Sequence, residues 1–231
     1  MSSYQKNARI TGALFITAAV AGIMSVVLSK PVLDDPEYLL KIAENGSRVI
    51  TGALLEAIMA FACAGIAIWL YPVLRKHNEA IALGSVGFRI IEAVFFVVAA
   101  ICLLSLLTVG REYVKAGAPD APHYQDVGAL LLAVRYWASQ VFAALAFVLG
   151  ALLYYSIFYQ SRIIPRWLSG WGIIAITLHL AAVLLTLFAL ITPFSKIQVM
   201  LALPVFLQEM VLAVWLIVKG FDPSRQHEPI S

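Results

Sequence analysis

Charged residues are scarce in this sequence. Only 13% of its 231 residues are Asp, Glu, Lys or Arg, whereas 62% are hydrophobic and the mean hydropathy is +0.91. A soluble domain has about 25% charged residues, so this chain cannot cover a water-exposed surface with polar groups. The composition excludes a soluble globule, a disordered chain and a nucleic-acid-binding protein. It indicates an integral membrane protein.

Cysteine and histidine are also rare. The chain has two cysteines, four histidines and no CxxC motif, which excludes a zinc site of the usual Cys/His spacing. Cys63 and Cys102 fall at different depths of separate apolar segments and are predicted to be packing residues. HExxH, GxSxG, Walker A and GxGxxG patterns are all missing. We therefore expect no bound metal and no cofactor.

Long apolar stretches dominate what remains. Six of them reach the length of about 20 residues that a helix needs to cross the hydrocarbon core. They cover residues 8–28, 48–71, 84–109, 127–155, 167–191 and 199–218. The first continues to Leu28, beyond the length of an ordinary signal-peptide h-region, so we expect it to be an uncleaved helix. The sequence predicts an all-α bundle of six transmembrane helices, forming one domain over residues 1–231.

The loop after the first stretch has a helical pattern of its own. Asp35 can cap a helix, Pro36 suits the first helical position, and Gly46 suits the exit. Leu39, Ile42 and Ala43 would share one face. These features predict a short amphipathic helix in the first outer loop, lying on the membrane surface.

Basic residues in the loops favour one orientation. The side that carries both termini holds eight: Lys6, Arg9, Arg75, Lys76, Arg162, Arg166, Lys219 and Arg225. The opposite side holds six: Lys30, Lys41, Arg48, Arg111, Lys115 and Lys196. By the positive-inside rule, we expect both termini on the cytoplasmic side of the membrane. The tyrosines of residues 154–159 are interpreted as part of the inner aromatic belt.

Several polar residues fall inside the apolar stretches. A charge at the bilayer centre costs about 2.5–3.5 kcal/mol even on the lenient insertion scale, so these side chains should face one another or a wet cavity. The predicted intramembrane polar cluster, a candidate ligand-binding site, consists of Glu56, Arg89, Glu92, Arg135, Gln140, His179, Gln208 and Glu209.

The rise of about 1.5 Å per residue gives the depth of each side chain. Glu56 and Arg135 each lie about 12 Å from the outer ends of their stretches, so we expect that they can form a buried pair. The pair could belong to a ligand site or be a structural clamp that fixes helix register. Glu209 lies about 15 Å from the outer end of its stretch and His179 about 18 Å from the inner end of its own, so these two could also approach.

Arg89 and Pro204 are two further positions of interest, and for Arg89 two alternatives are open. Arg89 can pair with Glu92 three residues along the same helix, or it can snorkel to the nearby headgroups. Pro204 is the only proline well inside a stretch. It removes a backbone donor, and it predicts a helix kink one turn before Gln208 and Glu209.

Short motifs at these positions connect the chain with a known family. They are Arg9-Ile10-Thr11-Gly12-Ala13-Leu14, Leu70-Tyr71-Pro72-Val73-Leu74-Arg75, Phe88-Arg89-Ile90-Ile91-Glu92-Ala93, Ser161-Arg162-Ile163-Ile164-Pro165-Arg166, Gln208-Glu209-Met210 and Trp215-Leu216-Ile217-Val218-Lys219-Gly220. The chain resembles, nearly end to end, the bacterial membrane family described as domain of unknown function 4386. The resemblance implies a six- to seven-helix inner-membrane protein and supplies no reaction.

Three functional classes are compatible with this pattern. The first is a small-molecule or lipid binding protein, or a transporter, whose buried polar pocket takes a small hydrophobic or amphipathic ligand. The expected partners of the protein are this ligand and membrane lipids. The second is a structural or regulatory membrane subunit whose charges serve packing. The third is an intramembrane enzyme that uses Glu209 and His179 as acid and base. It is the weakest because no nucleophile is evident. The sequence leaves the ligand and the oligomeric state open.

Overall fold

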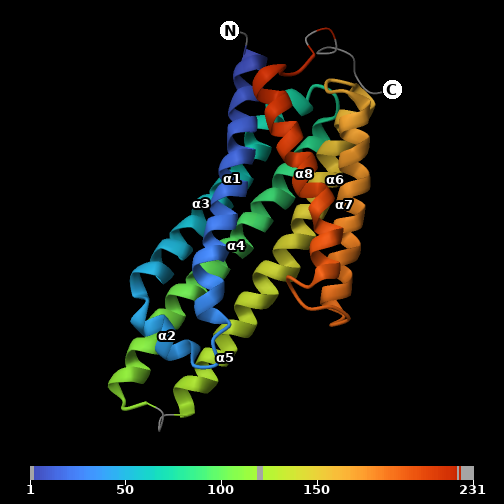
Figure 1. The fold of residues 1–231 in the computed structure, drawn as a ribbon. Helices are drawn as coiled ribbons and strands as arrows, with labels where there is room; N and C mark the ends of the chain where they lie inside the picture. The colour runs from blue at the N-terminus through green and yellow to red at the C-terminus, as the bar shows by residue number, and fades with distance from the viewer. Residues whose placement is uncertain (1–2, 119–121, 223, 225–231) are drawn as a thin grey trace.

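Long helices make up nearly all of the protein. The computed structural model describes residues 3–118, 122–222 and 224, and the elements run in the order α1 (Ser3–Leu33), α2 (Tyr38–Glu44), α3 (Gly46–Leu74), α4 (Glu79–Lys115), α5 (Pro122–Tyr136), η1 (Trp137–Phe142), α6 (Ala143–Ser161), α7 (Arg166–Leu187) and α8 (Lys196–Val218) (Figure 1). Within the described part, six helical segments are long and apolar enough to cross a membrane, with α5, η1 and α6 forming one of them. The predicted all-α fold with six spans is confirmed, and the chain is a multi-pass membrane protein. Asp120, Arg225 and Glu228 lie outside the described residues.

Helix ends differ from the predicted limits in both directions. The α4 helix has 37 residues, about 55 Å at 1.5 Å per residue, because polar residues at its two ends continue the helix beyond the apolar stretch. The α7 helix ends at Leu187, four residues before the predicted limit at Ile191. There the backbone N–H of Phe188 bonds the Leu184 carbonyl, and Ala189 turns to a left-handed φ of 55°.

The short helix predicted after the first span is present, but its start and its surroundings differ from the prediction. Asp35 accepts a bond from the Glu37 backbone N–H at 2.8 Å, so it forms a turn before the helix instead of capping it. Gly46 begins α3. Leu39 and Ile42 are buried, and α2 packs against α4 so closely that a Cβ at Gly110 would lie 2.6 Å from the Leu39 carbonyl oxygen. The apolar face of α2 therefore contacts protein and not lipid.

Six helices form a closed ring around the end of the molecule that carries the N-terminus. Neighbours pack in the order α1, α3, α4, α6, α7 and α8, and α8 packs back on α1 (Figure 1). Gly12 closes the ring, because a Cβ at this position would lie 2.6 Å from the Ala213 carbonyl oxygen. The ring interior contains Tyr154, Tyr155 and Phe158, all fully buried. These tyrosines are core residues, so their assignment to the aromatic belt is wrong.

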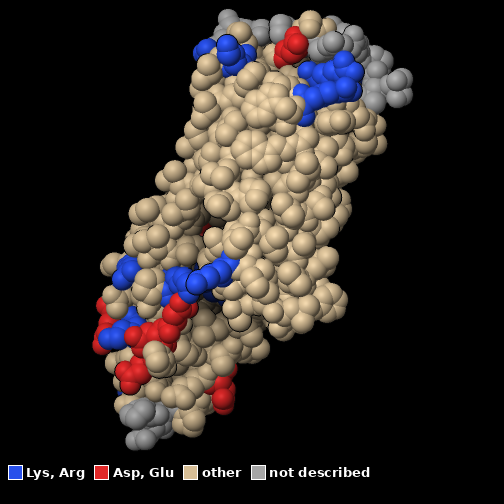
Figure 2. Space-filling model, turned by 45° about the vertical axis from the view of Figure 1, so that its right-hand side comes forward, with Lys and Arg blue, Asp and Glu red and all other residues tan. Residues whose placement is uncertain are grey.

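The opposite end of the molecule is more open. There α5 packs on α4, and α2 and α5 extend beyond the connection between α7 and α8 (Figure 1). Figure 2 shows charged side chains at the two ends of the visible face, with an uncharged band between them. This distribution is what a membrane-spanning bundle requires, because charges are costly within the hydrocarbon core.

Replacing Ala189 with glycine should stabilise the fold. Ala189 is exposed and has a φ of 55°, a conformation that costs an L-residue about 1–2 kcal/mol and that glycine adopts freely. Since glycine also loses more backbone entropy on folding, we expect a net gain of about 0.5–1 kcal/mol. The apparent melting temperature in detergent should rise by about 1–4 °C, and an unchanged or lower value would contradict this account.

Candidate functional site

An ion pair between two distant helical segments marks the first polar site. Arg135 Nη1 lies 2.7 Å from Glu56 Oε2 and 2.5 Å from the Ala99 carbonyl oxygen. The side chains are 13% and 5% exposed, respectively. The equal depths of Glu56 and Arg135, calculated from the sequence, predicted this contact. The structure brings the two side chains together, Glu56 from α3 and Arg135 from α5.

A π-helical segment begins two residues after Arg135. The segment η1 interrupts the span between α5 and α6, and Ser139 donates its hydroxyl to the Arg135 carbonyl at 2.9 Å. Gln140 Nε2 donates to Ser139 Oγ at 3.3 Å. Single π-turns inside α-helices occur frequently at functional sites. Sequence reasoning missed this turn, and the adjacent polar residues Ser139 and Gln140 inside an apolar stretch were the only available signal.

The Glu56–Arg135 pair lies in the wall of a large cavity. Its volume is about 690 Å³, and its lining comes from α1, α3, α4, the α5–η1 junction and the loop between α7 and α8. Apolar side chains form most of the wall, including Ile23, Val26, Val27, Met59 and Phe96. Figure 2 shows a hollow on this face, with an acidic side chain visible inside it and basic side chains below it. The cavity is therefore apolar with a small charged part.

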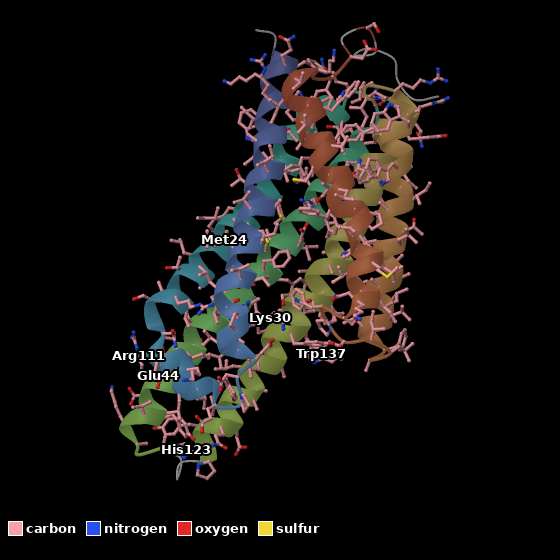
Figure 3. All side chains as sticks on the ribbon, in the orientation of Figure 1. Met24, Lys30, Glu44, Arg111, His123 and Trp137 are labelled. Carbon is pink, nitrogen blue, oxygen red and sulfur yellow. The ribbon has the colours of Figure 1, made fainter. Side chains whose placement is uncertain are left out.

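Charged and aromatic groups also border the cavity near the C-terminal end of α1. Lys30, in the last turn of α1, pairs with Asp34, which lies just after the end of the helix. The Lys30 ammonium lies 5.3 Å from the Phe194 ring centroid. All three residues line the cavity. In Figure 3, Lys30 lies between α1 and α5. Phe194 has a φ of 61°, and such left-handed geometry in a non-glycine residue concentrates at ligand-contacting segments.

A second charged pair lies inside the helix ring. Arg89 Nη1 and Glu92 Oε2 are 2.9 Å apart on α4, and their side chains are only 2% and 4% exposed. The guanidinium carbon of Arg89 lies 5.0 Å from the Phe147 ring centroid. The pairing alternative for Arg89 is thus confirmed. The snorkelling alternative is wrong, because α6 packs over this side chain and separates it from the headgroups.

The polar residues of α8 are held by the tyrosines of α6. Gln208 is fully buried, accepts a bond from the Tyr155 hydroxyl and donates from Nε2 to the Leu168 carbonyl at 3.1 Å. Glu209 Oε1 accepts from the Tyr154 hydroxyl at 3.5 Å. Helix α8 runs through Pro204 without interruption. These contacts tie α8 to α6 and α7.

The expected approach of His179 to Glu209 is not found. His179 packs against Phe147 with ring centroids 5.7 Å apart, and its buried Nδ1 has no hydrogen-bond partner among the described residues. Similar depths along two helices did not bring these side chains together, because depth leaves the direction around each helix undetermined. An acid–base pair of Glu209 and His179 therefore has no geometric support.

The predicted polar residues divide into three groups. Glu56, Arg135 and Gln140 line the cavity. Gln208 and Glu209 join the Arg89–Glu92 pair inside the ring, and His179 packs separately against Phe147. Within the described part of the chain, no group of three His, Cys, Asp or Glu residues is arranged to hold a metal ion. Cys63 and Cys102 are buried and free.

Comparison with known proteins identifies a family. The sequence model of the family described as domain of unknown function (DUF4386) matches residues 10–220. No curated protein and no solved structure matches the chain. The matched range includes every residue that lines the cavity.

Proposed function

Because the chain belongs to the DUF4386 family, whose description names no activity, we propose from the cavity itself that this protein binds a small amphipathic molecule. The cavity of about 690 Å³, mostly apolar and with the Glu56–Arg135 pair in its wall, is the observation that carries the proposal. Ligand cavities of about 300–1,000 Å³ typically combine apolar walls with a few convergent polar groups.

Most of the other polar side chains in the wall are already occupied. The Ser25 hydroxyl donates to the Gly52 carbonyl at 2.8 Å, and the Ser29 hydroxyl donates to the Ser25 carbonyl at 2.7 Å. These serines therefore add little polarity to the cavity. A ligand would meet apolar surface along α1 and a polar patch at Glu56, Arg135 and Gln140, apart from the Lys30–Asp34 pair at the border of the cavity. This arrangement suits a molecule with one polar end and one apolar end.

The position of the cavity supports a ligand that comes from the lipid phase. We propose that the protein lies in a bacterial inner membrane. The basic loop residues favour an orientation with both termini on its cytoplasmic side. The cavity then lies in the outer half of the bilayer, because Glu56 is ten residues, about 15 Å, from the start of α3 at Gly46. Membrane lipids and small hydrophobic or amphipathic molecules are the partners that this position supports.

A substitution that fills the cavity tests the proposal. Val26 lines the cavity, so Val26→Trp should occupy its volume without removing any of the polar groups. Val20→Trp is the matched control, because Val20 is on the same helix, 56% exposed and outside the lining. We expect native mass spectrometry of the detergent-purified protein to show a bound amphipathic species on the wild type and on Val20→Trp. This species should be absent or reduced at least about tenfold on Val26→Trp.

Equal retention of the bound species by the two tryptophan variants would contradict the proposal. A wild-type protein that carries no such species would contradict it as well. Size-exclusion profiles that match the wild type would show that both variants fold.

One observation favours a second, structural function for part of the molecule. The Arg89–Glu92 pair is sealed inside the ring and does not line the cavity. Buried ionic groups can fix the register in which helices pack, so this pair supports the role of a structural or regulatory membrane subunit. The two functions use different residues and are compatible.

A further inference from the structure

We propose that the ligand of this cavity has an uncharged head group that both donates and accepts hydrogen bonds, joined to an apolar chain. A primary amide and a hydroxyl are such groups. This inference rests on the proposed binding function and specifies its ligand class. It follows from the hydrogen-bonding atoms that the Glu56–Arg135 pair leaves unused and from the net charge of that pair.

Both members of the pair have unused hydrogen-bonding capacity. Arg135 uses only Nη1, which bonds Glu56 and the Ala99 carbonyl. Among the described residues, neither Nε nor Nη2 of Arg135 has a hydrogen-bond partner. Neither atom is completely buried. Glu56 likewise uses Oε2 and leaves Oε1 without a partner in the described part. A ligand head group can therefore accept from Arg135 and donate to Glu56 at the same time.

The charge of the site argues against an ionic head group. Glu56 and Arg135 neutralise each other, and the Lys30–Asp34 pair at the outer border does the same. A carboxylate bound at Arg135 would place a second negative charge beside Glu56, and an ammonium bound at Glu56 would place a second positive charge beside Arg135. Either would leave one uncompensated charge within mostly apolar walls, which is costly. An uncharged head group satisfies the same atoms without that cost.

The apolar chain has a continuous surface on which to lie. Ile23, Val26 and Val27 line the cavity from α1, and Met59 and Phe96 line it from α3 and α4. Gly22 also lines it, and a Cβ there would lie 2.6 Å from Met59 Sδ. Because Gly22 has no side chain, α1 and α3 can approach each other closely beside the surface on which the ligand's apolar chain would lie.

Three probes of nearly equal size separate the possibilities. N-lauroylglycinamide has an uncharged primary amide, N-lauroylglycine has a carboxylate in the same place, and N-(2-aminoethyl)lauramide has an ammonium. Their binding to the full-length protein in nanodiscs at neutral pH can be measured by native mass spectrometry titration. We expect the amide to bind at least about tenfold more tightly than either charged probe.

A single variant tests the role of charge directly. Glu56→Gln keeps the shape of the side chain but leaves Arg135 uncompensated, so the preference should shift toward the carboxylate by about tenfold or more. If the wild type binds a charged probe as tightly as the amide, the proposal is overturned. If Glu56→Gln keeps the wild-type preference, the explanation by pair neutrality is overturned.

The outcomes also separate this inference from the proposed function. If all three probes bind the wild type equally and Val26→Trp weakens all of them, the cavity binds amphipathic molecules but the inferred head-group class is wrong. If no probe binds, or if Val26→Trp leaves their binding unchanged, the proposed function itself fails.

Discussion

Replacing Arg89 with leucine is expected to lower the free energy of unfolding by about 3–5 kcal/mol, because it leaves a buried charge without its partner. Glu92 is 3% exposed and its Oε2 has no hydrogen-bond partner among the described residues, so Arg89 at 2.9 Å supplies its compensating charge. The substitution also removes the contact of the guanidinium with the Phe147 ring. Thermal unfolding in detergent, followed by intrinsic fluorescence, measures the effect.

Two further variants make this test specific. Arg89→Leu combined with Glu92→Leu removes both charges, and replacing a buried pair by apolar residues is often close to neutral, so most of the stability should return. Arg111→Leu is the control for loss of an arginine from the same helix, because Arg111 is exposed. It should change stability by no more than about 0.5 kcal/mol. Equal losses for Arg89→Leu and Arg111→Leu would refute the assignment of Arg89 as a buried charge partner.

A single methyl group at Gly12 should also be destabilising, by about 1–3 kcal/mol. The Cβ of Gly12→Ala would lie 2.6 Å from the Ala213 carbonyl oxygen and 2.7 Å from Ile217 Cγ1. The backbone oxygen cannot move away without moving α8, so α1 and α8 must separate. Because this contact closes the helix ring, we expect a lower apparent melting temperature and faster proteolysis at this end of the molecule.

Gly87 provides the matched control. It also lies inside a helix, α4, but a Cβ there would meet nothing within 4 Å. Alanine has the higher helix propensity, by up to about 1 kcal/mol, so Gly87→Ala should be neutral or stabilising. Opposite signs for the two substitutions are the expected result. If Gly12→Ala is as well tolerated as Gly87→Ala, close packing at the ring closure is not what limits stability.

The six spans could be predicted because each apolar stretch can be judged by itself. Its length is compared with the thickness of the hydrocarbon core, and its hydropathy does not depend on which helices are neighbours. The Glu56–Arg135 pair was also accessible from the sequence. Its depth could be calculated from the helical rise, and a charge at that depth needs a partner. The family motifs agree with the fold, and the match over residues 10–220 confirms the membership.

Other features depend on which helices are neighbours, and the sequence does not contain that information in readable form. Tyr154 and Tyr155 lie near an end of their span, where tyrosine usually marks the membrane interface. They are buried because α6 packs between α4 and α7. His179 and Glu209 have compatible depths, but the structure pairs Glu209 with Tyr154 instead.

The cavity and the π-turn illustrate a different difficulty. A cavity is a property of several helices together, and its lining residues come from segments that are far apart in the chain. The η1 segment has no proline or glycine, which are the residues that usually mark a helix irregularity in a sequence. What distinguishes it from an α-helix is its backbone pattern, in which the Ala143 N–H bonds the Ala138 carbonyl five residues earlier.

The unequal lengths of the helices have a consequence for the surrounding lipid. The 22 residues of α7 and 23 of α8 span about 33–35 Å, close to the thickness of a hydrocarbon core, whereas the 37 residues of α4 span about 55 Å. A flat bilayer matched in thickness to α7 and α8 would leave the ends of α4 and α5 near α2 beyond its surface. A thicker bilayer would cover these ends, so we expect acyl-chain length to change how readily a molecule reaches the cavity.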